Sequence, residues 1–336
     1  MRKIFTLLAA VTVAATMYAT EGALKGMFSI NADGDQVCFS QGNLQYRATT
    51  GTWRFAENQT DFIGQDNDNA GATYDGWIDL MPYGSSGFDN NRMPYDRVRY
   101  LQQDIAGTDY DWGQFCAISN GGNTPGLWRT LTKPEFEYII SERPNANLLR
   151  SWASVNGVDG MILLPDNWQL PQALTFTPLA GDYTTNTYSA LQWTQMENAG
   201  AVFLPAAGQR DYNIIFYEEG GTGCEYKYSR NGGYYRTSSV VDIISYDGTP
   251  HYLSPQYFSF SDKGSFSETH RNDFMMGWCH EDDDMSLSVR LVRDNNIADE
   301  KTLTGRFSVW EDEQVQFAQG NLQYRASTDQ WQFAED

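Results

Sequence analysis

Side chains that could act as nucleophiles or bind a transition metal are few and widely separated in this sequence of 336 residues. A zinc site or a redox dithiol needs cysteines a few residues apart, and the sequence holds no C-x-x-C pair. None of its three histidines accompanies a recognisable Ser or Cys nucleophile motif, which argues against a triad hydrolase. In an oxidising compartment the cysteines could form up to two disulfides, in three connectivities, or stay as free buried thiols. The cysteines are Cys38, Cys116, Cys224 and Cys279.

Carboxylates cluster at two places, and such clusters suit calcium better than a transition metal. Asp66 and Asp68 lie in a stretch rich in Asp, Asn and Gly, whereas Asp282 and Asp283 lie in the acidic run 281–284. A pair of carboxylates could also serve a glycosidase, but adjacent acidic residues more often form a solvated loop. The sequence therefore predicts either calcium held by these four aspartates or two solvated acidic loops.

Aromatic residues occur at intervals in the loop-rich stretches and could form a binding surface. Their rings give a large contact area at low entropic cost, so they could stack on sugars or anchor a protein ligand. Packing in the core is the alternative for about half of them. The candidate surface combines the loops of residues 66–111 with Tyr212 and the run 281–284. The candidate ligand-binding residues are Trp77, Tyr83, Tyr95, Trp112 and Tyr212.

The charge balance narrows the class of partner. The chain has 43 acidic and 23 basic residues, a formal net charge of −20, and no run of Lys or Arg. Nucleic acid and anionic membranes attract the opposite sign of charge, so neither is an expected partner. A hydrophobic content of 41% with 14% aromatic residues is enough for a packed core, which argues against disorder.

The first twenty residues have the pattern of a secretory signal peptide. Arg2 and Lys3 precede an apolar stretch from Ile4 to about Ala15, and small or polar residues follow as far as Thr20. The apolar stretch is shorter than a membrane span, and no later segment has the length or apolar character of one. We therefore expect an exported protein, extracellular or on the cell surface, with the periplasm as the remaining alternative.

An internal repeat sets the expected domain boundaries. Residues 36–57 recur at 314–335, with 16 of 22 positions identical and an offset of 278. Residues 26–29 likewise match 305–308, one residue out of step. We predict a signal peptide at 1–20, a complete unit at 22–294, a linker at 295–304 and a truncated second repeat at 305–336. The alternative is that the terminal hairpin packs on the first unit as a duplicate edge.

The repeated segment has the alternation of β-strands. Every second residue is kept between the two copies while many of its neighbours change, which is the period of a strand with one buried face. Residues 48–52 then form the turn of a hairpin, and Gly42 and Asn43 form a bend in its first arm.

Two helix starts follow from capping boxes, at Thr132 with Glu135 and at Ser189 with Gln192. The first helix must end before Pro144, and the second should end at Gly200. Two short helices among many antiparallel strands and long loops indicate the α+β class. The predicted strands lie at 201–204, 214–217, 234–238, 257–260 and 286–292.

Three motifs in this order resemble the formylglycine-generating enzyme and sulfatase-modifying-factor family. Residues 128–138, WRTLTKPEFEY, resemble its W-R-L-P-T-x-x-E-W-E-Y signature. Residues 232–239 are similar to its glycine-then-Y-W-S-S strand, and residues 288–293 to its closing F-R-L-V-R strand. Segments 199–208 and 41–46 resemble parts of secreted, repeat-bearing bacterial relatives. The resemblance implies a C-type-lectin-like fold, in which the N- and C-terminal strands pair and long loops form a binding surface.

The same resemblance does not carry over the family's catalysis. That activity relies on a close pair of cysteines near the last strands, binding copper, and only Cys279 lies in this region of the chain. Cys224 is 55 residues earlier and does not match the motif. We therefore expect a non-catalytic adhesion or binding module for a glycan or a protein. A formylglycine-generating-type oxidoreductase and a structural repeat of a surface fibre are the alternatives.

Overall fold

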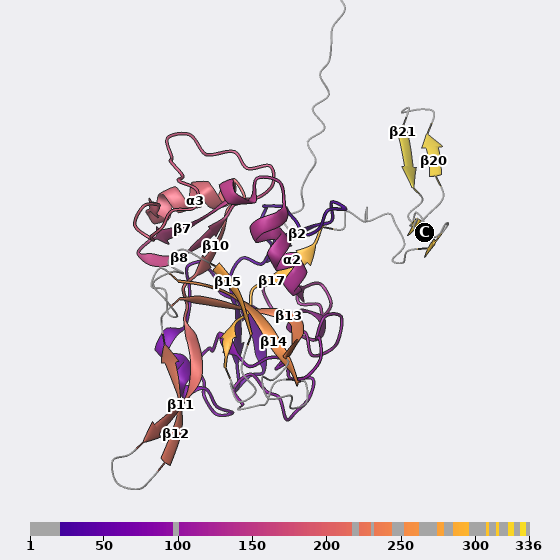
Figure 1. The fold of residues 1–336 in the computed structure, drawn as a ribbon. Helices are drawn as coiled ribbons and strands as arrows, with labels where there is room; N and C mark the ends of the chain where they lie inside the picture. The colour runs from indigo at the N-terminus through magenta and orange to yellow at the C-terminus, as the bar shows by residue number, and fades with distance from the viewer. Residues whose placement is uncertain are drawn as a thin grey trace, which may run out of the picture.

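A computed structural model describes most of the chain. The described residues are 21–96, 101–216, 222–229, 232–243, 252–261, 274–278 and 285–295, together with four short strands at 307–308, 314–315, 322–325 and 330–333. Short helices and mostly antiparallel strands make the protein α+β, as the sequence predicts (Figure 1). Among the described residues, no helix is long and apolar enough to cross a membrane.

The helices begin where the sequence predicts them. Thr132 accepts a hydrogen bond from the Glu135 backbone N–H, and the Glu135 side chain returns to Thr132, which completes the capping box of α2. Ser189 and Gln192 form the same box at α3. A π-helical turn prolongs α2 and ends before Pro144. The helices are α1 (Trp112–Phe115), α2 (Lys133–Glu137), the π turn (Tyr138–Glu142) and α3 (Ala190–Asn198), with 3-10 turns η1 (Gly64–Asn69) and η3 (Ala146–Leu148).

The second and the last strands of residues 21–295 pair with each other. β2 aligns antiparallel with β17, so that Phe39 lies opposite Val292 and Val37 lies opposite Asp294. The sheet order is β1-β2-β17-β6, which brings residues far apart in sequence side by side. The chain therefore closes on itself through this sheet. Its strands are β1 (Phe28–Ser29), β2 (Gln36–Phe39), β6 (Arg129–Thr130) and β17 (Leu291–Asp294).

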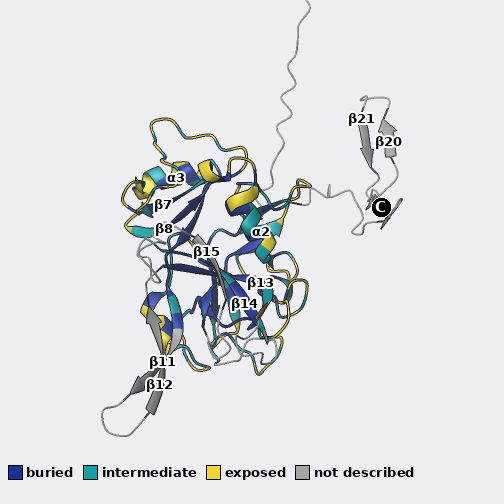
Figure 2. Cartoon of the chain, in the orientation of Figure 1, coloured by how far each residue is buried: buried dark blue, intermediate teal, exposed yellow. Residues whose placement is uncertain are grey.

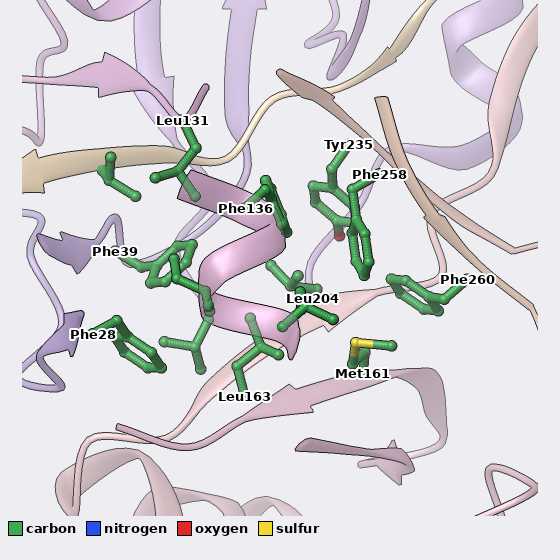
Figure 3. Close-up of a cluster of buried hydrophobic side chains, with 14 of the residues drawn as sticks. Phe28, Phe39, Leu131, Phe136, Met161, Leu163, Leu204, Tyr235, Phe258 and Phe260 are labelled. Atoms are coloured by element: carbon green, nitrogen blue, oxygen red, sulfur yellow. The ribbon is translucent and has the colours of Figure 1, made fainter. Parts of the chain in front are cut away.

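A five-stranded sheet supplies one wall of the main core. Its order is β15-β14-β13-β16-β5, and α2 packs Phe136 against Phe258 of β14, with ring centroids 4.6 Å apart. Figure 3 shows this core, where Phe28 and Phe39 approach the same helix from the first sheet. The strands are β5 (Leu80–Met81), β13 (Gly233–Ile243), β14 (Tyr252–Phe260), β15 (Phe274–Trp278) and β16 (Leu287–Ser288).

A third sheet, in the order β10-β8-β7-β9, carries α3 (Figure 1). The sequence interpretation missed the β7–β8 hairpin. Asn156 (φ 50°) and Gly157 (φ 81°) form its two-residue turn, and Asn-Gly is the residue pair that such turns prefer. The strands are β7 (Arg150–Val155), β8 (Val158–Leu163), β9 (Thr187–Tyr188) and β10 (Val202–Pro205).

The remaining strands form separate hairpins. The predicted hairpin at 44–55 is present, and the predicted strand at 214–217 is the end of a longer strand, β11. The predicted strand at 286–292 is broken into β16 and β17. The hairpins are β3 (Leu44–Arg47) with β4 (Thr52–Phe55), β11 (Gln209–Phe216) with β12 (Thr222–Ser229), β18 (Phe307–Ser308) with β19 (Gln314–Val315), and β20 (Leu322–Arg325) with β21 (Gln330–Phe333).

Candidate ligand-binding surface

The long loops between β4 and β6 are fixed by two buried carboxyl groups, of which Asp79 is the first. It accepts hydrogen bonds from the Asn67 side-chain amide (2.9 Å) and from the Ile63 backbone N–H (2.9 Å). Asn67 in turn accepts from the backbone N–H of Asp79 and of Leu80. Burial raises the pKa of Asp79 to about 6, because a charged carboxylate loses hydration there. This network ties η1 to β5.

Asp111 is the second buried carboxyl and caps α1. It accepts from the Gly113 backbone N–H (3.1 Å), the Thr130 backbone N–H (3.0 Å) and the Thr130 hydroxyl (2.8 Å). Burial again raises the pKa, to about 6, while these donors act in the opposite direction. Asp111 therefore joins α1 to β6 and holds the short helix against the body of the protein.

Three aromatic rings gather at the surface of this loop region, and we call Phe88, Tyr110 and Phe115 the aromatic cluster. Phe88 meets Tyr110 edge to face with ring centroids 5.4 Å apart, and meets Phe115 in the same way at 5.5 Å. Phe88 is 47% exposed and Phe115 is 39% exposed, whereas Tyr110 is half-buried. A contiguous group of exposed rings is a feature of interaction sites, because exposed apolar area is otherwise kept dispersed.

Ser86 holds the aromatic cluster in place. Its buried hydroxyl donates to the Asp109 carbonyl (2.6 Å) and accepts from the Phe88 backbone N–H (3.3 Å). The Cys116 thiol donates to the Ser86 carbonyl at 3.4 Å. Ser86 thus connects the three chain segments that carry the rings, which fixes the cluster before any ligand arrives.

Acidic residues border the cluster along the chain. Asp89 follows Phe88 directly, and the exposed Asp109 precedes Tyr110. Asp89 accepts hydrogen bonds from the backbone and side chain of Asn91, which orders the loop beside the ring. Two acidic residues therefore adjoin the rings along the chain.

Two of the predicted ligand-binding residues, Tyr83 and Trp112, are buried in the core, so neither side chain can reach a ligand at the surface. Tyr83 is 1% exposed, and its hydroxyl donates to the Ser238 carbonyl at 2.9 Å; burial raises its pKa. Trp112 is fully buried at the start of α1. The loops cover a second hydrophobic cluster of their own, and these two rings fill it.

Trp77 and Tyr95 are half-buried. The Arg54 guanidinium lies 3.9 Å from the centroid of the Trp77 ring, and that of Arg47 lies 4.8 Å away, so cations cover this indole. Tyr95 stacks on Tyr46 with centroids 6.4 Å apart. The structure therefore places neither ring in the aromatic cluster. The backbone of Tyr212 pairs with Tyr226 in β11–β12, but its side chain lies outside the described residues.

The predicted calcium ligands are only partly described. Asp66 and Asp68 are exposed on η1, whereas Asp282 and Asp283 lie outside the described residues. Within the described part of the chain, no group of three or more His, Cys, Asp or Glu side chains could hold a metal ion. Because Asp282 and Asp283 are not described, calcium binding by these four aspartates stays a prediction.

Cys38 and Cys116 are free thiols, so neither takes part in a disulfide. Burial raises the pKa of both thiols, which lowers the fraction present as the nucleophilic thiolate. The side chain of Cys224 and all of Cys279 lie outside the described residues. Whether these two thiols share a metal is therefore not tested.

An open hollow of about 620 Å³ beside α3 is a weaker candidate. Primary amides dominate its lining, and no titratable side chain contributes to it. It could accept polar groups but has no group for acid–base chemistry. The lining residues are Asn167, Gln169, Leu170, Pro171, Gln195, Asn198 and Ala199.

No family model, curated protein or solved structure matches this chain.

Proposed function

We propose that this protein is an exported, non-catalytic binding or adhesion module that captures a glycan or a protein ligand through the aromatic cluster. The observation that carries the proposal is the edge-to-face contact of Phe88 with Tyr110 and Phe115, with two of the three rings more than one-third exposed. Covering such rings removes apolar area from water, which favours binding by roughly 25 cal/mol per Å².

The chemistry around the rings supports a glycan or a protein surface as ligand. Ring faces and edges contact the C–H groups of sugars or the apolar side chains of a partner. Asp89 and Asp109, next to Phe88 and Tyr110 in the sequence, would supply carboxylate acceptors for hydroxyl groups or for basic side chains. The fixed position of the rings through Ser86 lowers the entropic cost of binding.

A C-type-lectin-like arrangement is the fold that we propose for residues 22–294. Two features support it: the antiparallel pairing of β2 with β17, and the long loops between β4 and β6 that carry the aromatic cluster. The resemblance of residues 128–138 to the formylglycine-generating-enzyme family agrees with this proposal, since Trp128 and Phe136 both lie in the core.

We also propose that the protein is exported. The signal-like pattern of residues 1–20 supports export, although these residues lie outside the described part of the chain. A net charge of −20 favours solubility in an extracellular setting and disfavours nucleic acid.

A structural repeat of a surface fibre is the second candidate, and one observation favours it. The hairpin β20–β21 has the same register as β3–β4, so the chain begins the same local structure twice. A purely structural repeat has no need of exposed ring clusters, which is why we prefer the binding module.

A glycan array probed with the full chain tests the proposal, in parallel with immobilised extracellular-matrix proteins. We expect saturable retention on a subset of the glycans or on one matrix protein. Retention on none of these surfaces, at protein concentrations up to the millimolar range, would contradict the binding function.

A further inference from the structure

The chain contains two copies of the segment that closes its own fold. We call residues 26–57 the resident segment and residues 305–335 the tail segment. In the resident segment, β3–β4 pairs Leu44 with Phe55; in the tail segment, β20–β21 pairs Leu322 with Phe333. All four residue pairs of the two hairpins correspond at the offset of 278. β18–β19 likewise repeats the pairing of β1–β2.

The resident segment is held by residues that follow it in the sequence. Its β2 pairs with β17, and the Leu44 backbone N–H donates to the Val289 carbonyl at 2.9 Å. Tyr46 and Ile78 exchange two backbone hydrogen bonds, each of 2.9 Å. These partners, with the core rings around them, form an acceptor for the resident segment.

The tail segment keeps nearly every residue that meets this acceptor. Eleven positions between 36 and 57 are buried, and ten of them carry the same residue in the tail segment. The exception is Ser40, which becomes Ala318 and loses only a local hydrogen bond to the Gly42 carbonyl. The other five substitutions fall at exposed or half-buried positions. The ten retained positions are Val37, Phe39, Gly42, Asn43, Leu44, Gln45, Tyr46, Trp53, Phe55 and Ala56.

The glycines give a stricter comparison, because two of them allow close approaches. A Cβ on Gly26 would lie 2.1 Å from the Gly200 carbonyl oxygen, and one on Gly42 would lie 2.5 Å from that of Ala56. The tail segment has glycine at both positions, Gly305 and Gly320. Gly305 therefore meets the steric requirement of the acceptor at Gly200, whereas the approach of Gly42 to Ala56 is internal to the segment and Gly320 leaves room for it.

The connection between the two segments is long enough. Asp294 lies opposite Val37, which lies opposite Phe28, so Asp294 and the position of Phe28 are two strand spacings apart, roughly 10 Å. The twelve residues between Asp294 and Phe307 can span up to about 40 Å. The tail segment of a chain can therefore reach the position of β1 in the same chain.

We propose that the tail segment can replace the resident segment in the acceptor of the same chain, which releases residues 26–57. The tethered tail has an effective concentration in the millimolar range, so replacement within one chain precedes exchange between copies at micromolar protein. Replacement puts Gln332 in the place of Arg54 and removes the guanidinium that lies 3.9 Å from the Trp77 ring. The surface around Trp77 therefore differs between the acceptor filled by the resident segment and the acceptor filled by the tail segment.

Charge substitutions in the full chain test the proposal. Leu44 is fully buried, so Leu44→Asp excludes the resident segment from the core. We expect Leu44→Asp to keep a cooperative thermal transition, Leu322→Asp to leave that transition unchanged, and the double variant to lose it. Equal loss in Leu44→Asp and the double variant would overturn the proposal, as would a double variant that still folds.

A disulfide trap reads out the exchange directly. Cys38 lies opposite Arg293 in the β2–β17 ladder, and Gln316 occupies the position of Cys38 in the tail segment. Facing residues of antiparallel strands lie within the Cα range of a disulfide. The test background is the triple variant Cys38→Ser/Gln316→Cys/Arg293→Cys. Adding Leu44→Asp to it should raise the yield of the 293–316 disulfide in monomeric protein at least tenfold, as measured by mass spectrometry. No increase, or a cross-link found only in dimers, would contradict exchange within one chain.

Discussion

The same residue types serve different purposes in the loop region, depending on how the backbone places them. Trp112 begins α1 and is buried, whereas Phe115 ends the same helix and is 39% exposed. Sequence alone indicates that aromatic residues are concentrated here. It could not separate Tyr83 from Phe88, because the burial of each depends on hydrogen bonds such as those of Ser86 and Asp111, formed across long sequence distances.

The buried carboxyl of Asp111 gives a prediction about pH. Its folded-state pKa of about 6 lies above the ordinary value of 3.8, so the folded protein binds this proton more tightly than the unfolded chain does. Its contribution to stability is therefore fully present below about pH 4 and is lost as the pH rises through 6. Relative to wild type, Asp111→Asn should gain on the order of 2–3 kcal/mol in free energy of unfolding between pH 4 and 7.

Urea unfolding of both proteins at several pH values measures this difference. Asp182→Asn is the matched control, because hydrogen bonds from Thr184 and Thr185 lower the pKa of the exposed Asp182. Its difference from wild type should change little between pH 4 and 7, because a pKa below 3.8 places its titration under that window. A difference for Asp111→Asn that stays constant from pH 4 to 7 would show that the group does not titrate as the structure implies.

At the scale of elements, short sequence motifs predicted the helix starts and one hairpin. Both capping boxes and the β3–β4 hairpin are confirmed, since a few adjacent residues specify each of them. The β7–β8 hairpin was missed although its Asn156–Gly157 turn is a strong signal. The family resemblance implied that the terminal strands pair, as β2 and β17 do. The order of the other strands could not be predicted, because it depends on pairings such as β16 with β5 between residues far apart in the sequence.

The close approach of β1 to the end of α3 gives a prediction about packing. A Cβ on Gly26 would overlap the Gly200 carbonyl oxygen at 2.1 Å, so Gly26→Ala must move one of the two backbones. We expect a loss of about 2–4 kcal/mol in the free energy of unfolding. Gly71→Ala is the control: its Cβ would have 3.8 Å to the nearest atom, and its stability should stay within about 0.5 kcal/mol of wild type. Similar transition midpoints for the two variants would argue against this contact.

At the scale of the whole molecule, buried polar groups join elements that are distant in sequence. The Gln59 side-chain carbonyl accepts from Arg290 (2.9 Å) and from the Phe203 backbone N–H (2.7 Å). Its amide donates to Glu197 of α3 at 3.0 Å. Arg290 is fully buried, and burial lowers its pKa to about 10. One side chain thus connects the loops, α3, β10 and the segment before β17. Figure 2 shows the buried strands at the centre of this arrangement.

Removal of Gln59 should therefore affect the entire fold. Gln59→Ala leaves the Arg290 guanidinium and the Phe203 N–H without this acceptor, and we expect a loss of about 2–4 kcal/mol. The exposed Gln102→Ala should change stability by no more than about 0.5 kcal/mol. Chemical denaturation followed by tryptophan fluorescence compares them, and a neutral Gln59→Ala would contradict the linking role.

The central claim is that the aromatic cluster binds the ligand, and the double variant Phe88→Ala/Phe115→Ala tests it on the glycan or matrix protein that retains the wild type. Both rings are partly exposed, so the variant should fold with a Tm close to that of wild type. Leu191→Ala, at a side chain 75% exposed on α3, is the matched control and should bind normally. We predict a Kd raised at least tenfold, roughly 1.4 kcal/mol, by titration calorimetry. An unchanged Kd in the folded double variant would contradict the account.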